Sequence, residues 1–160
     1  MNTIIDYEII VKSLNNKNEY IIEYSQELLP DWEDIPKTII FLFFKCQCML
    51  DGSNLTEEEL EKDKLLLEFN RLGKEFYYLS KKQGILTEII CPKTGFPQYS
   101  TKGNQIFITQ QLVKRYLPSF QVKSGECGLI HPVWSQAVYP CIIISSASIT
   151  EIQPIISLVF

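Results

Sequence analysis

The stretch from Lys123 to Ser148 reads K-S-G-E-C-G-L-I-H-P-V-W-S-Q-A-V-Y-P-C-I-I-I-S-S-A-S. Its second half, Ala137–Ser146, is rich in β-branched and aromatic residues and predicts a strand in the hydrophobic core. Its first half contains the single histidine of the chain, His131, and places Cys127 between two glycines. Because glycine lets another molecule approach the backbone closely, we expect any chemistry of this protein to lie in this first half.

The length and composition of the chain indicate one globular domain spanning residues 1–160. Of the 160 residues, 46% are hydrophobic and 21% are charged, which is ordinary for a folded domain. A domain of this size can bury roughly 70% of the surface of its unfolded chain. The net charge is −4, and no cluster of Lys or Arg provides the concentrated basic face that nucleic-acid binding requires. We therefore expect no nucleic-acid partner.

Three further features predict a soluble, cytoplasmic protein that does not bind membranes. The N-terminal sequence M-N-T-I-I-D-Y-E lacks the basic-then-apolar pattern of a signal peptide. The longest apolar run, Ile39–Phe44, is about a third of the length of a membrane span. The five cysteines are odd in number and have no regular spacing, which favours free thiols in a reducing compartment.

The N-terminal third predicts two strands separated by a helix. Ile4–Val11 and Thr38–Met49 are expected to be strands, and Glu19–Leu29 is expected to be an amphipathic helix that Pro30 ends. The centre of the second strand, I-I-F-L-F-F, is apolar at every position. This pattern predicts a central strand that is covered on both faces.

The clearest helix follows the second strand. Thr56 is its expected N-cap, and Glu59 completes a capping box three residues later. Gly84 is the expected residue just beyond its C-terminus. The apolar positions recur at steps of three and four, which predicts one buried stripe formed by Leu65, Phe69, Leu72, Phe76 and Leu79.

The following segment predicts shorter elements. Ile85–Cys91 is expected to be a strand that ends in a turn at Pro92–Gly95. A short strand is expected at Gln105–Ile108. Thr109 is the expected cap of a helix over Gln110–Tyr116.

The C-terminal third predicts two strands, Gly128–His131 and Ala137–Ser146, joined by Pro132–Ser135 as an antiparallel pair. The apolar tail, Ile149–Phe160, is interpreted as a strand or an arm that covers a sheet edge. The order of elements predicts an α+β sandwich with an antiparallel or mixed sheet and helices packed against it.

The remaining cysteines offer weak support for a metal site. Cys46 and Cys48 form the closest pair, and on a strand their thiols would share one face. A structural zinc site needs four ligands, usually supplied as two such pairs, and the other thiols are isolated. The residues therefore favour thiols buried in the core.

Cys127 and His131 could form a nucleophile and a base, because they are four residues apart on extended chain. No nearby Asp or Asn is placed to orient the histidine. Glu126 would raise the pKa of the thiol and Lys123 would lower it. No glycine-rich phosphate loop is present, so the residues give no support to a flavin or nucleotide site. Acyl transfer stays a minor alternative.

Three blocks of the sequence carry a resemblance to a known family. The first joins the long helix, with L-L-L-E-F (65–69) at its centre, to the strand that ends in P-K-T-G (92–95). The second is S-G-E-C-G-L-I-H-P-V-W (124–134), and the third is Y-P-C-I-I-I-S-S-A (139–147). Their order and spacing resemble the C-terminal domain of the methylmalonic aciduria and homocystinuria type D protein family (CblD), over nearly the whole chain.

The resemblance implies a nitroreductase-like fold that has no functional flavin site and no enzymatic activity. It implies an adaptor in cobalamin (vitamin B12) trafficking that binds a CblC-like cobalamin-processing protein, in the pathway of methionine synthase or methylmalonyl-CoA mutase. No cofactor would bind to the chain alone, and cobalamin would be shared with the partner. The chain would be a monomer or a homodimer. It starts almost at the domain, from which we expect a bacterial or otherwise untargeted form.

The resemblance also suggests the residue that contacts cobalt. The family has two adjacent cysteines where this chain has Glu126 and Cys127. One placement of the gap puts Cys127 on the second family cysteine and Glu126 on the first, which is credited with cobalt binding. Moving the gap by one residue puts Cys127 on the first. Cys127 is our candidate for the cobalt ligand, because a thiolate is a soft and strong donor.

The residues around Cys127 are expected to shape its loop and the partner surface. They are Gly125, Glu126, Gly128, His131 and Trp134. Two alternatives stay open. The chain could be a small flavin-dependent reductase, since that fold class commonly binds flavin mononucleotide at a dimer interface. It could also be a structural interaction domain with no link to cobalamin.

Overall fold

The computed structural model describes residues 4–123 and 128–160, and its centre is a four-stranded sheet. The strand order is β1 (Tyr7–Ser13), β2 (Thr38–Lys45), β6 (Val138–Ser145) and β3 (Thr87–Ile90). All three strand pairings are antiparallel. Helices cover both faces of this sheet, so the prediction of an α+β domain with an antiparallel sheet and packed helices is confirmed.

Strand β2 has the predicted central position between β1 and β6. Its residues from Thr38 to Phe44 are all buried. Because neighbouring side chains in a strand point to opposite faces, the run divides into two sets. Phe41 and Phe43 belong to the hydrophobic cluster on one face, and Leu42 and Phe44 belong to the cluster on the other. A strand whose central run is apolar on both faces can therefore hold both cores together.

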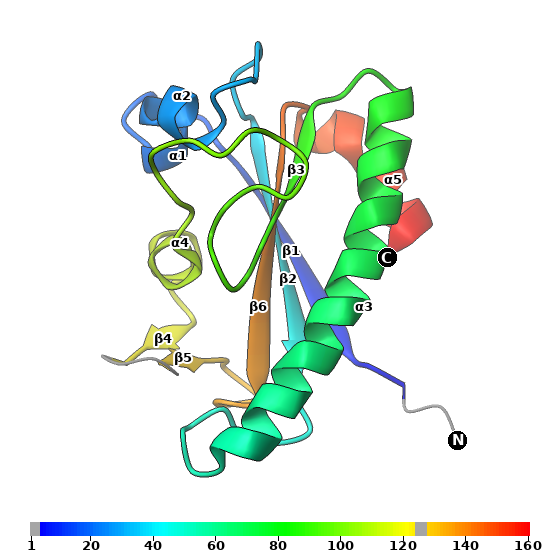
Figure 1. Cartoon of the computed structure of the whole chain (residues 1–160). Coiled ribbons are helices and arrows are strands. Elements are labelled where there is room, and N and C mark those ends of the chain that lie inside the picture. Colours follow the sequence, from blue (N-terminus) through cyan, green and yellow to red (C-terminus); the bar gives the residue numbers. More distant parts are fainter. Residues whose placement is uncertain (1–3, 124–127) are drawn as a thin grey trace.

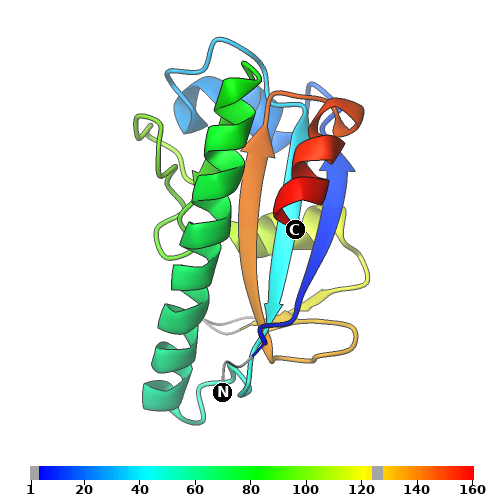
Figure 2. The same cartoon turned by 90° about the vertical axis from the view of Figure 1, so that its right-hand side faces the viewer.

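The two faces carry different elements, as Figure 1 shows. One face packs against α3 (Leu55–Lys82) and α5 (Ile149–Val159). The opposite face carries the three short helices and a two-stranded ribbon. These are α1 (Tyr20–Glu23), α2 (Ser25–Leu28), α4 (Thr109–Tyr116), β4 (Gln121–Val122) and β5 (Leu129–Ile130). In Figure 2, α3 runs the length of the sheet, while α5 covers the part beside β1.

Helix α3 confirms the predicted buried stripe but begins differently. Leu65, Phe69, Leu72 and Phe76 are buried, and Leu79 is partly buried against the same cluster. The prediction of Thr56 as N-cap is wrong.

The side chain of Asn54 caps α3 instead, by accepting the backbone N–H of Glu57 at 3.2 Å. This earlier start lets the Glu58 carboxylate accept the N–H groups of Gly52 (2.8 Å) and Asn54 (2.9 Å). These bonds fix the loop before the helix. At the other end, Gly84 follows the C-cap with φ +72°, as predicted.

The C-terminal tail is a helix, so its interpretation as a strand or arm is wrong. Ser148 accepts the N–H of Glu151, and the Glu151 side chain accepts the N–H of Ser148, which makes a complete capping box. Ile152 and Ile155 face the core. Pro154 lies inside the helix and removes one backbone donor. The isoleucine-rich composition also suits a strand, but the cap and the burial of one face favour the helix.

Two other predictions are corrected in the first and middle parts of the chain. The expected helix over Glu19–Leu29 is divided at Tyr24, which has φ −105° and ψ 24°. The expected strand over Gln105–Ile108 is irregular. The Gln105 N–H donates to Glu27 O (3.2 Å), at the end of α2, and the Phe107 N–H donates to Gly95 O (2.9 Å). These bonds take the place of a strand ladder.

Strand β5 does not pair with β6 as predicted. It pairs with β4, through Gln121 opposite Ile130 and Val122 opposite Leu129. The chain between β5 and β6 closes on itself, because His131 and Ser135 exchange two backbone hydrogen bonds of 2.8 and 3.1 Å. Ser135 has φ +56°, which makes the turn tight. The residues after this turn form β6, which pairs with β2 and β3 instead of with β5.

Candidate functional site

The cysteine-containing segment, residues 124–127, lies between β4 and β5, the two strands of the ribbon. The Lys123 N–H donates to Gly128 O at 2.6 Å, one step beyond the last strand pair. Gly125, Glu126 and Cys127 lie outside the described residues. Gly128 is buried and lines a cavity. Gly128, the first described residue after residues 124–127, therefore lies in the cavity wall, and Lys123 is bonded to it.

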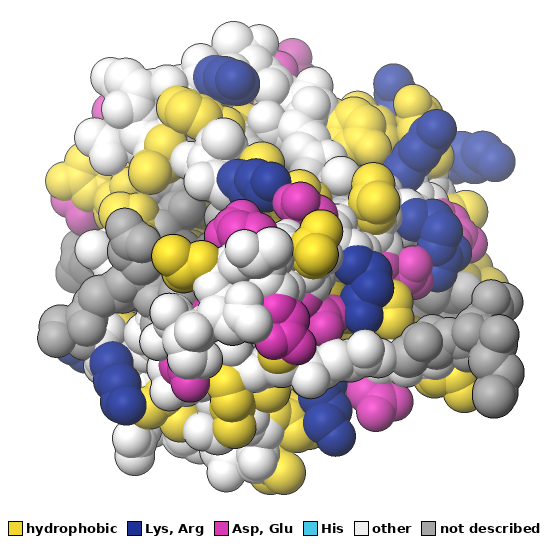
Figure 3. All heavy atoms as spheres, turned by 60° about the horizontal axis from the view of Figure 1, so that its bottom comes forward, with side chains coloured by type: hydrophobic (Ala, Val, Ile, Leu, Met, Phe, Trp, Pro, Cys, Tyr) yellow, Lys and Arg dark blue, Asp and Glu magenta, His cyan; other side chains and the backbone are white. Residues whose placement is uncertain are grey.

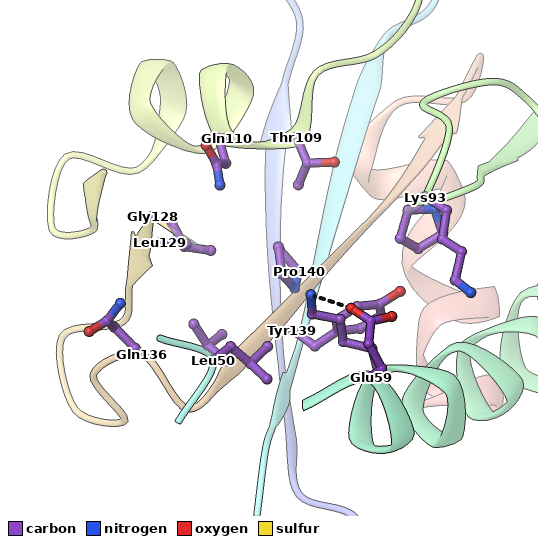
Figure 4. A pocket seen from close by; sticks show the side chains of 13 residues that line it. Leu50, Glu59, Lys93, Thr109, Gln110, Gly128, Leu129, Gln136, Tyr139 and Pro140 are labelled. Carbon is purple, nitrogen blue, oxygen red and sulfur yellow. Dashed lines mark hydrogen bonds and ion pairs between the residues drawn. The ribbon is translucent and has the colours of Figure 1, made fainter. Parts of the chain in front are cut away.

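The cavity has a volume of about 360 Å³ and lies between α4, the N-terminal half of α3 and β6. In Figure 4, Thr109 and Gln110 lie on one side, Glu59 and Lys93 lie on the other, and Pro140 lies between them. The complete lining is Leu50, Glu59, Lys62, Pro92, Lys93, Thr109, Gln110, Gly128, Leu129, Gln136, Val138, Tyr139 and Pro140.

The cavity lies where β3 stops. The last residue of β3, Ile90, pairs with Ile142, so β3 does not extend along the first four residues of β6. In an antiparallel strand the N–H and C=O of one residue point to the same side, and successive residues alternate. The Ser146 N–H donates toward β3, to Leu86 O (2.8 Å), so the even-numbered residues of β6 face that side.

The backbone groups of Val138 and Pro140 therefore point to the β3 side of β6, beyond the point where β3 ends. Both residues line the cavity. This explains how an inner strand of the sheet tolerates proline. Pro140 has no N–H, and at this position none is needed for a ladder bond to β3. Among the described strands, none pairs with this side of β6 at Val138 and Pro140.

Tyr139 contributes a phenol to the cavity wall. Its side chain lies on the α3 face of the sheet, and the residue is only 6% exposed. Burial, followed by the nearby Cys141 and Cys91 thiols, raises the pKa of Tyr139 well above its ordinary value of 10.0. The group is therefore a neutral donor at physiological pH.

The charges around the cavity are mixed. Lys62 Nζ lies 3.3 Å from Glu59 Oε1, and Lys93 Nζ lies 3.0 Å from Asp63 Oδ1. Figure 3 shows basic, acidic and hydrophobic side chains interspersed over this end of the molecule. The surface in that view is not a continuous basic face of the kind that binds nucleic acid.

The first turn of α4 adds backbone donors. Its N-cap residue, Ile108, has no side chain that accepts a hydrogen bond from the helix. Thr109 and Gln110, the first two residues of the helix, both line the cavity. The N-terminal N–H groups of a helix have no partners within the helix and carry partial positive charge.

His131 is buried behind the ribbon and is bonded through both ring nitrogens. It is 4% exposed. Its Nδ1 atom accepts the backbone N–H groups of Val133 and Trp134, each at 3.0 Å. Its Nε2 atom lies 3.1 Å from Glu8 Oε1. The neutral Nε2–H tautomer satisfies all three contacts, so neither nitrogen is free to take a proton from a neighbouring thiol.

An aromatic cluster surrounds this histidine. The His131 ring stacks on the half-buried Trp134, with centroids 4.2 Å apart and an interplanar angle of 11°. Phe120 meets it edge-on at 5.1 Å. Together with the tight turn, this cluster fixes the base of β5. The structure thus brings Gly128, His131 and Trp134 into one end of the molecule.

Sequence reasoning missed Glu8, which orients His131 from strand β1. No local pattern identifies it, since the two residues are 123 positions apart. Near His131 in the sequence, no Asp or Asn is placed to orient its ring. The sheet order, with β1 next to β2 at this end, supplies a carboxylate from the other end of the chain.

The described cysteines are free thiols in different environments. Cys46 follows the end of β2 and is buried, which raises its pKa to about 12, and Cys48 is half-buried. Cys141 is fully buried, and burial raises its pKa. Partial burial acts to raise the pKa of Cys91, but hydrogen bonds from Thr94 and the backbone of Lys93 outweigh it, so that pKa is lowered.

The described part of the chain contains no group of three or more His, Cys, Asp or Glu residues arranged to hold a metal ion. Within the same residues, none of the helices has both the length and the apolar composition needed to cross a bilayer.

Comparison with known proteins adds no family to this picture. No protein-family model matches the chain. No curated protein matches it either. The fold and the site define an α+β domain with an antiparallel sheet and a cavity at one end, beside the ends of the cysteine-containing segment.

Proposed function

We propose that this chain is a cobalamin-trafficking adaptor with a nitroreductase-like fold. It binds a CblC-like cobalamin-processing protein and offers the Cys127 thiolate to the cobalt of the cobalamin that the partner holds. The proposal rests on the sequence resemblance of the three blocks. The observation that carries it further is the closure between Lys123 and Gly128, which holds both ends of the Cys127 segment together at the edge of a cavity.

The anchoring on both sides of this segment suits the proposed role. Before it, β4 pairs with β5 and follows α4 closely. After it, His131 is fixed by Glu8, by two backbone donors and by Trp134. A segment with fixed ends presents its thiol to a partner at a lower cost in conformational entropy than a free tail does.

The proposed ligation is an exchange at cobalt(III) without a change of oxidation state. The Cys127 thiol gives its proton to solvent, and its sulfur replaces the water or hydroxide on the exposed face of cobalamin. The cobalt–oxygen bond breaks as the cobalt–sulfur bond forms. In this proposal His131 is a positioning residue for the loop base, since both of its nitrogens are already bonded.

The remaining parts of the proposal follow from the adaptor role. The chain has no catalytic residues, holds no cofactor alone and serves the methionine synthase or methylmalonyl-CoA mutase pathway. It works in the cytoplasm as a monomer or homodimer, without nucleic acid or membrane. Gly125, Glu126, Gly128 and Trp134 shape the surface that meets the partner.

The affinity for the partner, with and without bound cobalamin, tests this proposal. Cobalamin should strengthen binding of the wild type but not of Cys127→Ser. Cys48→Ser is the matched control, because Cys48 is a half-buried free thiol elsewhere in the chain, and it should behave as wild type. Equal affinities for all three proteins under both conditions would instead support a structural interaction domain. Flavin absorbance in the purified protein would support the reductase alternative.

A further inference from the structure

We propose that Cys91 and Cys141 form a reversible disulfide between the end of β3 and strand β6 when the protein meets hydrogen peroxide. Both are free thiols in the structure. The cobalamin proposal uses neither of them, and the inference depends on neither cobalt nor a partner protein. It assigns a redox modification site to two cysteines at the end of the β3–β6 ladder.

Cys91 lies opposite Cys141 when the register of β3 and β6 is continued by one residue. The last assigned pair joins the residue before Cys91 to the residue after Cys141. The ladder stops there for a chemical reason. The next pair that could exchange hydrogen bonds is Pro92 with Pro140, and neither proline has an N–H to donate. The end of the ladder is therefore compatible with cysteines that still face each other.

The backbone of Cys91 continues the geometry of the strand. Its N–H donates to Phe96 O and its C=O accepts the Gly95 N–H, each at 2.8 Å, so both groups point to the outer side of β3, away from β6. Even-numbered residues of β6 direct their backbone groups to β3, so those of Cys141 point the other way, to β2. The two cysteines thus form a non-hydrogen-bonded pair. Such pairs have Cα atoms about 4.5 Å apart, within the disulfide range of about 4.4–6.8 Å.

Both side chains lie on the α3 face of the sheet. Cys141 belongs to the hydrophobic cluster on that face and is fully buried. Ile89 belongs to the same cluster, and Cys91 follows it by two residues in extended chain, so the two side chains share a face. The thiols are also close enough to interact, because burial, followed by the nearby Cys46 and Cys91 thiols, raises the pKa of Cys141.

Cys46 lies on the same face but too far along the strands to be the partner. Its N–H donates to Ala137 O at 2.9 Å, which places it beside a residue four positions before Cys141. At about 3.3 Å per residue, this is about 13 Å along the strand. A disulfide needs Cα atoms less than about 7 Å apart. Among the described cysteines, the register therefore selects Cys91.

The two thiols have complementary environments. Cys91 is half-buried, and partial burial acts to raise its pKa, but hydrogen bonds from Thr94 and the backbone of Lys93 outweigh burial and lower the pKa. Its thiolate is therefore available to an oxidant. Cys141 has no contact with solvent. A reactive, accessible cysteine beside a second thiol that resolves it is the arrangement found in redox sensors.

The reaction has two steps. The Cys91 thiolate attacks one oxygen of hydrogen peroxide, and the sulfur–oxygen bond forms as the oxygen–oxygen bond breaks. The hydroxide that leaves takes a proton from solvent and becomes water. The Cys91 sulfur then turns from its N–H donors, and the Cys141 sulfur displaces its hydroxyl group, which leaves as water with the Cys141 proton. Two electrons pass from the sulfurs to peroxide, giving one disulfide and two waters.

Peptide mapping after brief oxidation identifies the pair. The protein is treated with hydrogen peroxide in small molar excess, blocked with iodoacetamide and digested without reduction. Trypsin would leave Cys127 and Cys141 on one peptide, because no Lys or Arg follows Lys123. Chymotrypsin separates them by cleaving after Trp134. The wild type should give peptides linked through Cys91 and Cys141, and dithiothreitol should release them.

Variants test the order of the steps. Cys141→Ala removes the resolving thiol, so labelling of the Cys91 sulfenic acid by dimedone should rise at least about fivefold over wild type. Cys46→Ala is the matched control, since it removes another buried thiol from the same face, and it should behave as wild type. Cys127→Ser should keep the link. Circular dichroism checks the fold of each variant, and the mapping of the wild type depends on none of them.

Several results would overturn the proposal. They are a Cys91 that peroxide leaves as a free thiol, a Cys91 that becomes sulfinic acid without a link, and a link from Cys91 to Cys46 or Cys127. Equal dimedone labelling of wild type and Cys141→Ala would also overturn it. The reaction contains no cobalamin, so failure here is distinct from failure of the cobalt proposal.

Discussion

The Nε2 atom of His131 lies 3.1 Å from Oε1 of Glu8, a residue 123 positions away in the sequence. This contact joins strand β1 to the turn that follows β5. The other ring nitrogen accepts the N–H groups of Val133 and Trp134. The histidine therefore connects the first strand of the sheet to the base of the cysteine-containing segment.

Replacing His131 should destabilise the protein more than replacing Glu8. His131→Ala leaves two backbone N–H groups without their acceptor and removes a buried ring, at a cost of about 2–4 kcal/mol in the free energy of unfolding. Glu8→Gln keeps an acceptor and should cost less than about 1 kcal/mol, because Glu8 is partly solvated. Urea denaturation measures both. A loss in Glu8→Gln equal to that in His131→Ala would contradict this account.

Glu88 should make stability depend on pH. Its carboxylate is fully buried, and Oε2 accepts the N–H groups of Ile89, Gln98 and Tyr99 at 2.9–3.1 Å. Oε1 has no hydrogen-bond partner among the described residues. Burial outweighs the hydrogen bonds from Ser100 and its neighbours, and the pKa is raised above the ordinary 4.5.

A raised carboxyl pKa means that the folded state favours the protonated form. The stability from this effect is fully present below pH 4.5, the ordinary pKa of the group, and is lost as the pH rises through the raised pKa. Glu88→Gln cannot ionise, so its stability relative to wild type should increase with pH over that interval. Urea unfolding of both proteins across the interval measures the difference. A difference independent of pH would show that Glu88 does not titrate as described.

Cys91 should be the fastest of the described thiols to react with iodoacetamide near neutral pH. Its pKa is lowered, whereas burial raises the pKa of Cys46 to about 12 and raises that of Cys141. Because the thiolate is the nucleophile, Cys91 should react at least about tenfold faster than these two. Thr94→Val should slow it. Mass spectrometry of peptides after timed alkylation gives the rates, and faster labelling of Cys46 would refute the assignment.

The N-terminal cap of α5 should contribute about 1 kcal/mol to the free energy of unfolding. Ser148→Ala removes the acceptor for the Glu151 N–H, and N-cap substitutions of this type typically cost that amount. Ser157→Ala, near the end of the same helix, is the control and should change stability less. Thermal unfolding compares the two. An effect in Ser148→Ala no larger than in Ser157→Ala would argue against a stabilising cap.

The sequence predicted the parts of the fold whose signals are local and strong. The apolar run of β2 and the stripe of α3 depend on periodicity, which burial enforces directly. The tail of the chain was misassigned because its interpretation used only its apolar composition, whereas the Ser148–Glu151 capping box starts a helix there. The pairing of β5 with β4 depends on how a five-residue turn closes, and composition does not determine that closure.

The candidate site was only partly accessible from sequence. Gly128, His131 and Trp134 were selected, and the structure places them at one end of the molecule. The cavity itself depends on β3 being shorter than β6, which leaves Pro140 without a partner on the β3 side among the described strands. Glu8 depends on the strand order. Both are long-range consequences of the sheet and have no signature in neighbouring residues.

The most direct test of the central claim is an ultraviolet–visible titration of cobalamin with the candidate partner, adding either wild type or Cys127→Ser. The account predicts a cobalt–thiolate spectrum that appears only when both the partner and the wild-type chain are present and is absent with the variant. An unchanged cobalamin spectrum with the wild type, or the same new spectrum with Cys127→Ser, would contradict the claim that Cys127 binds cobalt.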